Sequence, residues 1–496
     1  MSDFILVIDE GTTSTRAIVY DRDFREVALA QEEVALQYPQ DGWVEQDGEE
    51  IWTRTLSVCR AVIAKAGGAG RIAAIGITNQ RETTLVWDRK TGKPLAPAII
   101  WQDRRTAAFC DGLKAKGYEG DVQGETGLLL DPYFSGTKIN WVLSNVSGAR
   151  ARAEAGELAF GTVDTFLLWR LTGGRVHATD VTNASRTLLY RLGLGSEGGW
   201  SAAMGEMFGV PPEMLPEVKP SAADFGTTDG AIFGRAIPVA SILGDQQSAL
   251  VGQGCLRAGQ AKITFGTGAF LVANTGAVRP VSENRLLGTM GYALPGADAM
   301  ALEGSIFNAG TVIKWLRDDL GLIQKADESA AAAASLKDNG GVYMVPAFTG
   351  LGAPHWDAEA RGLITGLTRA ATGAHLVRAG LESVAYQTHD LLAAFAGDGA
   401  PIAELRVDGG MVGNDWLMQF LADVCALPVL RPDYREMTAL GAAAAAAMQI
   451  GWLSAQDWAA RDVPGKRFEP GMGQSARSAL LAGWDAALER ALRNAE

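Results

Sequence analysis

The first fifty residues alternate between apolar runs and short polar segments, a pattern that predicts strands joined by turns. Apolar runs at residues 4–8 and 17–20 flank the polar segment DEGTTSTR, which is typical of a strand, a turn and a second strand. Another extended stretch follows at residues 26–37. Asp47 and Glu50 then have the three-residue spacing of a capping box, which marks the start of a helix.

The pattern after residue 50 predicts this helix and then a buried strand. Apolar side chains recur at helical spacing, at Ile51, Trp52, Val58, Cys59, Val62 and Ile63. The glycine-rich segment at residues 67–70 ends the helix, and the apolar run IAAIGIT at 72–78 predicts a strand buried on both faces. Strands and helices in this order indicate an α/β domain.

The second half of the chain repeats the order of these elements, although not their residues. Residues 261–276 again predict strand, Gly/Thr-rich turn and strand, and helical spacing follows at 310–320 and 374–396. A strand that ends in Asp408 is followed by two glycines and another helix. We therefore predict three segments: a first domain at 1–253, a second domain at 254–455, and a peripheral helical tail at 456–496.

Composition and charge exclude several classes of protein. At 496 residues, 47% apolar and 20% charged, the chain is globular and long enough for two cores. Its net charge of −13 argues against an extended nucleic-acid surface, because phosphate backbones require clustered Lys and Arg. The sequence has no apolar run long enough to predict a membrane span, no secretory signal pattern and no CxxC or HExxH motif. We expect a cytoplasmic protein with reduced thiols and no zinc site.

The polar segment between the first two strands carries the donors that an anion with several oxygens requires. Its glycine lets the backbone approach a ligand closely. Its hydroxyl and guanidinium donors are Thr12, Thr13, Ser14 and Arg16. Asp9, at the end of the strand, could hold a hydrated Mg²⁺, since this cation commonly binds one carboxylate and several waters. The alternative is a hairpin whose Thr and Ser side chains bond only their own backbone.

A second turn of the same kind strengthens the interpretation of the first. Residues 265–268, FGTG, include Thr267 as a donor, and Asp408 is followed by two further glycines. Two phosphate-sized turns, one in each half, predict a nucleotide clamped between two domains. The plan is similar to that of actin-like (ribonuclease H-like) ATPases, which include sugar kinases and Hsp70-type chaperones. No GxxxxGK[ST] motif is present, so the P-loop class is excluded.

Two acidic positions outside these turns could act on a hydroxyl substrate. Asp245 ends an apolar strand before a predicted helix, where a carboxylate could deprotonate an attacking hydroxyl; the alternative is a helix-capping Asp. Arg81 and Glu82 follow the buried strand at 72–78, at the sheet edge where ligands bind in open α/β sheets. Together they could accept from and donate to a polyol, or they could form an ordinary surface ion pair.

Twelve segments, in order from about residue 4 to residue 452, resemble the FGGY carbohydrate kinases. They are DEGTTSTRAIVYD, GWVEQD, ITNQRETT, IIWQDRR, DPYFSGTK, FGTVDTFLLW, TNASRT, GDQQSAL, TFGTG, VPAFTGLGAPHWD, RVDGGMVGNDWLMQ and REMTALGAA. Within this family, TNQRETT and DPYFSGTK are similar to the members that phosphorylate glycerol rather than a pentulose.

The resemblance implies a role for individual residues. It implies that the glycerol hydroxyls are bound by Arg81, Glu82, Tyr133 and Asp245, and that the carbon chain packs against Trp101 and Phe270. Asp245 would be the general base. It implies that ATP is bound by Thr12, Thr13, Ser14, Arg16, Thr267, Gly310, Gly410 and Asn414, and that Asp9 holds Mg²⁺ through water. From the residues alone, Trp101 and Tyr133 could equally be core aromatics.

The sequence departs from the family pattern at three places. Glu10 stands where many members carry Gln, and Lys314 stands where Gln is common near the adenine. Residues 226–235 lack the Gly-Gly-Thr-Arg arrangement of an anionic effector loop, so we do not expect regulation by a sugar phosphate.

We therefore expect two actin-like domains that close on MgATP and glycerol and form sn-glycerol 3-phosphate and ADP by direct transfer. By resemblance, the enzyme would be a homodimer or homotetramer. Two alternatives remain open at this stage: an FGGY kinase for a pentulose, erythritol or similar polyol, and a nucleotide-gated binding protein of the Hsp70 type. Against the second, no β-rich peptide-binding domain follows the second half.

Overall fold

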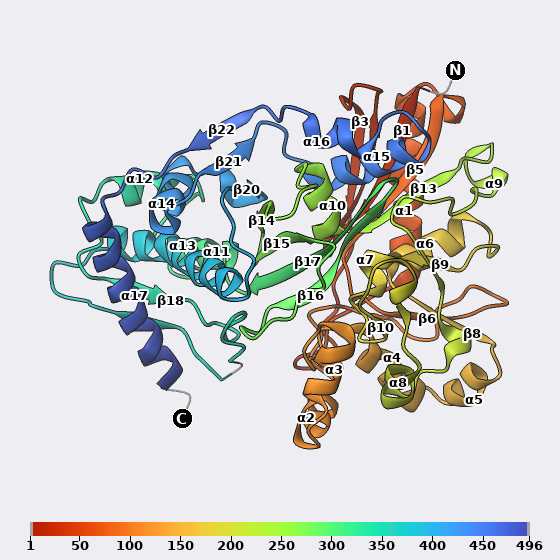
Figure 1. Ribbon diagram of the computed structural model, residues 1–496, viewed down its shortest axis with the longest axis horizontal. Helices are drawn as coiled ribbons and strands as arrows, with labels where there is room; N and C mark the ends of the chain where they lie inside the picture. The colour runs from red at the N-terminus through yellow and green to blue at the C-terminus, as the bar shows by residue number, and fades with distance from the viewer. Residues whose placement is uncertain (1–2, 358, 494–496) are drawn as a thin grey trace.

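The computed structural model describes residues 3–357 and 359–493 (Figure 1). Its first large sheet has five strands in the order β13-β5-β1-β2-β3. They are β1 (Phe4–Glu10), β2 (Ser14–Tyr20), β3 (Glu26–Glu33), β5 (Ile72–Asn79) and β13 (Val239–Gly244). The antiparallel hairpin of β1 and β2 confirms the predicted strand, turn and strand, and β5 and β13 continue the sheet in parallel.

Both faces of β1, β5 and β13 are buried, as the apolar run at 72–78 predicts for β5, whereas β3 at the edge is largely exposed. Successive side chains of a strand point to opposite faces. Leu6 and Ile8 therefore pack in one core with α1 (Gly48–Lys65), and Ile5 and Val7 pack in another with α15 (Met437–Gln449).

The start of α1 has the predicted N-cap but not the predicted capping box. Asp47 is the N-cap, and its carboxylate accepts a hydrogen bond from the amide of Glu49 at 2.9 Å. Glu50 does not complete the box: its carboxylate pairs with Arg54, one turn further along the helix, at 3.5 Å. The competing i,i+4 ion pair accounts for the difference.

The second large sheet has seven strands in the order β16-β17-β15-β14-β20-β21-β22. They are β14 (Ala261–Phe265), β15 (Ala269–Gly276), β16 (Leu287–Leu294), β17 (Ala297–Ile306), β20 (Leu405–Asp408), β21 (Val429–Pro432) and β22 (Gly465–Phe468). The predicted second hairpin is β14–β15, and β20 lies parallel to β14. The phosphate-sized turns therefore occupy equivalent places in the two sheets.

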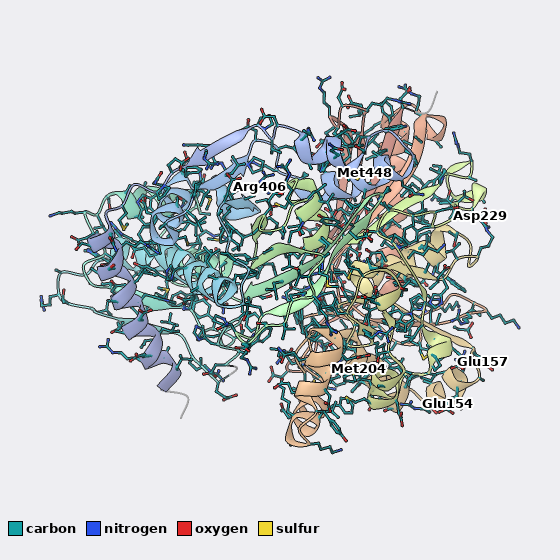
Figure 2. The ribbon with its side chains drawn as sticks, viewed as in Figure 1. Glu154, Glu157, Met204, Asp229, Arg406 and Met448 are labelled. Atoms are coloured by element: carbon teal, nitrogen blue, oxygen red, sulfur yellow. The ribbon has the colours of Figure 1, made fainter. Side chains whose placement is uncertain are left out.

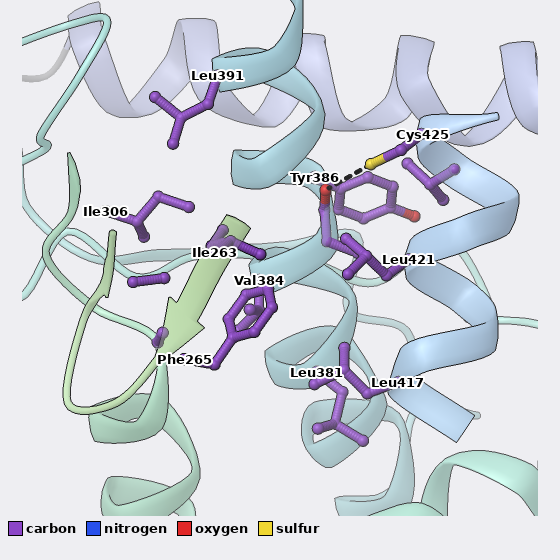
Figure 3. Close-up of a cluster of buried hydrophobic side chains, with 14 of the residues drawn as sticks. Ile263, Phe265, Ile306, Leu381, Val384, Tyr386, Leu391, Leu417, Leu421 and Cys425 are labelled. Atoms are coloured by element: carbon purple, nitrogen blue, oxygen red, sulfur yellow. Dashed lines mark hydrogen bonds between the residues drawn. The ribbon is translucent and has the colours of Figure 1, made fainter. Parts of the chain in front are cut away.

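Helices α11 (Gly310–Asp318), α13 (Gly373–Gly397) and α14 (Asp415–Cys425) pack with the second sheet in the largest core. Figure 3 shows Ile263 and Phe265 of β14 facing Leu381 and Val384 of α13, with Leu417 of α14 beyond. The apolar positions at helical spacing confirm the amphipathic helix predicted over 374–396.

The remaining elements connect or cover the sheets. Between β3 and β13 lie β4 (Glu45–Gln46), β6 (Leu85–Asp88), β7 (Ala98–Ile99), α2 (Ala107–Ala115), α3 (Glu119–Thr126), α4 (Ser135–Asn145), α5 (Ala149–Glu154), β8 (Leu158–Gly161), α6 (Val163–Leu171), β9 (Ala178–Asp180), α7 (Val181–Ala184), β10 (Tyr190–Arg191), β11 (Gly199–Trp200), α8 (Ala202–Phe208), β12 (Glu217–Lys219) and α9 (Gly230–Phe233). After β13 come α10 (Asp245–Gly252), α12 (Glu328–Ala334), β18 (Tyr343–Val345), β19 (Leu363–Thr365), α16 (Ala455–Ala460) and α17 (Gln474–Arg493). None of the helices among the described residues has the length and apolarity needed to cross a bilayer.

The chain crosses between the two sheets more often than the sequence suggested. After β21, α15 returns to pack on the first sheet, so residues 437–449 share a core with Ile5 and Val7 although we predicted 254–455 as a second unit. Met448 marks this helix in Figure 2, which also shows Arg406 of β20 near α10. The Arg406 guanidinium donates to the carbonyl of Gln253 at the end of α10.

The expectation of a peripheral helical tail is wrong in two respects. Residues 465–468 form β22, which pairs antiparallel with β21 at the edge of the second sheet. Trp484 of α17 is fully buried, stacks on Tyr386 with ring centroids 5.3 Å apart, and donates its indole N–H to Asp390 at 2.8 Å. The short charged strand carries little apolar signal, and the burial of Trp484 depends on α13, almost a hundred residues away in sequence.

Candidate active site between the two sheets

The first turn joins β1 to β2 in a tight hairpin. The amide of Gly11 donates to the carbonyl of Ser14 at 2.9 Å, and a Cβ at Gly11 would lie 3.1 Å from the same carbonyl. Thr12, Thr13 and Ser14 stay accessible, whereas Thr15 is buried. The hydroxyl groups of these three residues are therefore accessible to an anion.

Arg16 lies on β2 immediately after the turn and is held by carboxylates on two sides. Its guanidinium pairs with Glu436, at the start of α15, and its Nε lies 3.6 Å from Oδ2 of Asp9. Burial raises the pKa of Asp9 to about 6, although Arg16 opposes the shift. A cation bound close to the turn would stabilise the charged form of this buried carboxyl group. The described residues include no cluster of three or more His, Cys, Asp or Glu side chains suited to a metal.

The second turn, between β14 and β15, packs directly on the start of α11. The amide of Gly310 donates to the carbonyl of Gly266 at 3.0 Å, and the amide of Ala309 donates to the carbonyl of Thr267 at 3.0 Å. A Cβ at Gly310 would lie 2.5 Å from the Gly266 carbonyl oxygen, so only glycine permits this approach. Thr267 itself is exposed.

A third Gly-rich segment follows β20. Gly409 has φ +96°, and a Cβ there would overlap the carbonyl of Phe265, so the segment packs on the second turn. Gly410 is exposed, and Asn414 caps α14 by accepting a hydrogen bond from the amide of Leu417 at 3.0 Å. Lys314 lies exposed on α11.

Arg81 and Glu82 are not a surface ion pair. They follow β5 and are 3% and 1% exposed. Nε of Arg81 lies 3.2 Å from Oδ1 of Asp245, and Glu82 accepts a hydrogen bond from Nε of Arg186 at 2.6 Å. Glu82 has φ +60°, a conformation that costs energy for a non-glycine residue and is common at functional sites.

The backbone of Glu82 is fixed by donors from a neighbouring helix. Its carbonyl accepts hydrogen bonds from Ser135 at 3.0 Å and from the ammonium of Lys138 at 3.3 Å, both on α4. Lys138 also donates to the carbonyl of Tyr133 at 2.6 Å. Burial lowers the pKa of Lys138 to about 7. The unusual conformation of Glu82 therefore rests on a side chain that the sequence did not single out.

Asp245 is the first residue of α10 and follows the N-cap Gly244; its carboxylate accepts a hydrogen bond from the amide of Gln246 at 2.7 Å, so the side chain also caps a free amide of the helix. Its side chain remains 31% exposed beside the fully buried Arg81. The backbone of α10 lies against that of α15, because a Cβ at Gly252 or Gly441 would overlap a carbonyl of the opposite helix. This contact fixes the helix that presents the Asp245 carboxylate.

Three aromatic rings lie next to this group of charges, and the nearest is Tyr133, whose centroid is 5.6 Å from Cζ of Arg186. Trp101 lies edge-on to Tyr133, with centroids 5.7 Å apart, and to Phe270, with centroids 6.0 Å apart. Its indole N–H donates to the hydroxyl of Thr12 in the first turn at 3.0 Å. All three rings are partly exposed rather than core. The structure therefore brings an apolar wall, the Asp245 carboxylate and the first turn into one region, with one ring contributed by the second sheet.

The sequence interpretation missed two members of the charged group, Arg186 and Glu303. Arg186 lies just after α7, in the segment TNASRT, and Glu303 lies within β17; both are fully buried. Glu303 pairs with Arg81 and accepts from Nη2 of Arg186 at 3.0 Å. A single Glu within a strand does not by itself indicate a functional site. The segment TNASRT indicated only the resemblance to the family and no role for Arg186.

Comparison with known proteins agrees with this architecture. The model of the FGGY family of carbohydrate kinases, N-terminal domain, matches residues 4–252, and the corresponding C-terminal domain model matches residues 261–450. The chain belongs to the FGGY family of carbohydrate kinases. Its relatives include a glycerol kinase of Rhodospirillum centenum, 58% identical over 98% of this chain and 97% of the relative. Glycerol kinase 1 of Pseudomonas aeruginosa is 54% identical over 99% of both chains.

Solved structures show the same fold. The glycerol kinase of Plasmodium falciparum with ADP matches this FGGY kinase with a TM-score of 0.92 and 35% identity, over 99% of this chain and 98% of that one. A gluconate kinase of Lactobacillus acidophilus has a TM-score of 0.88 at 19% identity, over 99% and 98% of the two chains, and shows the fold alone.

Proposed function

We propose that this FGGY kinase transfers the terminal phosphoryl group of ATP to glycerol and releases sn-glycerol 3-phosphate and ADP. One observation carries the proposal. The carboxylate of Asp245 lies 3.2 Å from Arg81 of the buried Arg81–Glu82 pair, and the partly exposed wall of Trp101, Tyr133 and Phe270 is bonded through Trp101 to the first phosphate-sized turn. The names of the full-length relatives support glycerol as the acceptor.

The acceptor site matches a short polyol. Glu82 and Asp245 accept hydrogen bonds from hydroxyl groups, whereas Arg81 and the phenol of Tyr133 donate them. The rings of Trp101 and Phe270 cover the carbon chain. These groups hold one terminal hydroxyl against Asp245, which supplies much of the rate enhancement that positioning gives to a phosphoryl transfer.

The transfer is a direct displacement. The acceptor oxygen forms a bond to the γ-phosphorus, the bond from that phosphorus to the β,γ-bridging oxygen breaks, and the hydroxyl proton passes to Asp245. ADP leaves with the electron pair of the broken bond. No covalent enzyme intermediate is required, because the phosphoryl group passes directly from ATP to the acceptor in a single step.

The two turns would bind ATP from opposite sides. Thr12, Thr13, Ser14 and Arg16 would contact the terminal phosphates, and Thr267, Gly310, Gly410 and Asn414 would complete the nucleotide site. Asp9 fits a hydrated Mg²⁺, since its carboxyl group lies at the first turn and a cation there would offset the effect of burial, which raises its pKa. Bound there, the ion would neutralise charge on the phosphates. Asp9 and Arg16 together orient the polyphosphate toward Asp245.

We further propose that the protein works in the cytoplasm, where MgATP is available, as a homodimer or homotetramer. Light scattering coupled to size-exclusion chromatography measures the oligomeric state; a monomer at assay concentration would overturn that part.

The direct test is release of ADP from MgATP with glycerol, ribulose, xylulose, erythritol or no acceptor. We expect turnover with glycerol and an equal amount of glycerol 3-phosphate. Turnover only with a pentulose would keep the kinase and overturn the acceptor. Slow ADP release that is indifferent to every acceptor would overturn phosphoryl transfer itself.

A further inference from the structure

Glu303 reaches the acceptor site from the second sheet. It lies on β17, which extends across the middle of the molecule, next to β16 that contacts α7 of the first domain (Figure 1). Its side chain is fully buried. One carboxylate oxygen accepts from Nη2 of Arg81 and Nη2 of Arg186, each at 3.0 Å, and the other pairs with Nη1 of Arg81.

This carboxylate fixes the orientation of Arg81. With both Nη atoms bonded to Glu303, the Nε edge of the guanidinium is left facing Asp245 at 3.2 Å. A planar guanidinium held bidentately can rotate little, so the position of Glu303 determines which donor meets the base. The remaining Nη1 contact, with Gln247 at 3.3 Å, lies on the same helix as Asp245.

Glu303 also allows two guanidinium groups to lie side by side. Burial by itself would raise the pKa of Glu303, but Arg186 and Arg81 hold it below its ordinary value, and the buried ammonium of Lys262 acts in the same direction. Without this carboxylate, Arg81 and Arg186 would repel each other in a site with little water. Arg186 would then lose its hydrogen bond to Glu303 and keep only the one from its Nε to Glu82, so its guanidinium would be less firmly oriented.

We propose that Glu303 is a positioning residue for the acceptor site: it holds Arg81 against Asp245 and Arg186 against Glu82 from the second domain. Because the carboxylate belongs to the second sheet and the groups that it orients belong to the first, the glycerol site is complete only with the two domains in contact. This inference rests on the proposed function. It adds that the affinity for glycerol depends on a residue of the second domain that does not itself face the acceptor.

The test compares Glu303→Gln with a matched control, Glu382→Gln. Glu382 is equally buried and pairs with Arg378 at 2.7 Å, but it lies on α13 in the core of the second domain, away from the acceptor site. Both variants remove one buried carboxylate that pairs with arginine: Arg81 and Arg186 in the first case, Arg378 in the second. Only the first is expected to change the acceptor site.

We expect Glu303→Gln to raise the glycerol KM at least about tenfold while the ATP KM stays within about twofold of wild type. Glu382→Gln should lower the thermal midpoint but leave both KM values within about twofold. Glu303→Asp, which keeps the charge but shortens the side chain, should give a glycerol KM between those of wild type and Glu303→Gln. This ordering reports positioning, because a loss of stability alone would not separate glycerol from ATP.

An unchanged glycerol KM in Glu303→Gln would overturn the inference, as would a parallel loss of affinity for glycerol and ATP. If Glu303→Gln does not fold, Glu303→Asp decides by the same criterion, and failure of both to fold would make Glu303 a purely structural residue. A wild-type enzyme that does not phosphorylate glycerol would instead refute the proposed function, so the two failures are distinguishable.

Discussion

Replacing Glu10 by glutamine should stabilise the protein, and by an amount that grows with pH. Glu10 ends β1, next to Asp9 and below the first turn, and is fully buried. One carboxyl oxygen accepts from the hydroxyl of Thr55 at 3.1 Å, while the other has no hydrogen-bond partner among the described residues. Burial raises the pKa of Glu10 from 4.5 to about 8, and the nearby charge of Asp9 adds to the shift.

The magnitude follows from linkage. Between pH 4.5 and 8 the folded protein keeps a proton on Glu10 that the unfolded chain loses, so the free energy of unfolding falls as pH rises through this window. The fall is about 1.4 kcal/mol per pH unit, or about 4 kcal/mol between pH 5 and pH 8. Glutamine at this position does not titrate and can still accept a hydrogen bond from Thr55. The free energy of unfolding of the variant therefore does not fall in this way as pH rises. Because a shift of 1 kcal/mol moves the midpoint of a domain this size by roughly 2–4 °C, the two proteins should differ by about 10 °C more at pH 8 than at pH 5.

Thermal unfolding followed by circular dichroism at pH 5, 6, 7 and 8 measures this difference. The other titrating groups, including Asp9, are common to both proteins and largely cancel in the comparison. Glu154→Gln, at an exposed carboxyl on α5, is the control and should show a small, nearly constant offset. A pH-independent offset for Glu10→Gln, or a variant less stable than wild type at pH 8, would refute a buried, protonated Glu10.

Four further substitutions test individual contacts of the site. Asp245→Asn should lower kcat by roughly 10²–10⁴-fold with a much smaller change in the ATP KM, and near-wild-type turnover would remove Asp245 as the base. Glu82→Ala should raise the glycerol KM by about tenfold or more, and an unchanged value would mean that its carboxylate does not bind the acceptor. Arg16→Ala should raise the ATP KM by about tenfold and leave the glycerol KM unchanged. An ATP KM equal to that of the wild type would mean that Arg16 forms its ion pair with Glu436 but does not bind ATP. Gly310→Val should weaken ATP binding, measured by titration calorimetry, because its Cβ would lie 2.5 Å from a carbonyl of the second turn, and wild-type affinity would contradict that close approach.

Local patterns were sufficient for the elements that carry the two turns. The apolar runs on either side of DEGTTSTR and FGTG predicted two hairpins, and the structure has both, as β1–β2 and β14–β15. Helical spacing predicted α1, α11, α13 and α14 within a few residues of their observed bounds. The apolar pattern did not predict elements that are short or polar, such as β22, whose four residues include Lys466 and Arg467.

The site residues, like the helices and strands, were only partly predicted from local sequence patterns. Sequence alone selected Asp9, Arg81, Glu82 and Asp245, because each follows an apolar strand where ligands commonly bind. It did not show whether Arg81 and Glu82 are exposed, since adjacent opposite charges have the same pattern on a surface and in a core. The aromatic residues came only from family resemblance, and the structure brings them together around the first turn.

The sequence by itself determined the two hairpins, the alternation of strands and helices, and the glycines that let a backbone approach a phosphate. These features depend on interactions between residues close in the chain, which periodicity and turn chemistry record. The tertiary structure decided that α15 returns to the first sheet and that Glu303 meets Arg81, 222 residues earlier in the chain. A charge within a strand is compatible with solvent or with a buried partner, and only folding, which removes water from both groups and brings their atoms into contact, selects the partner.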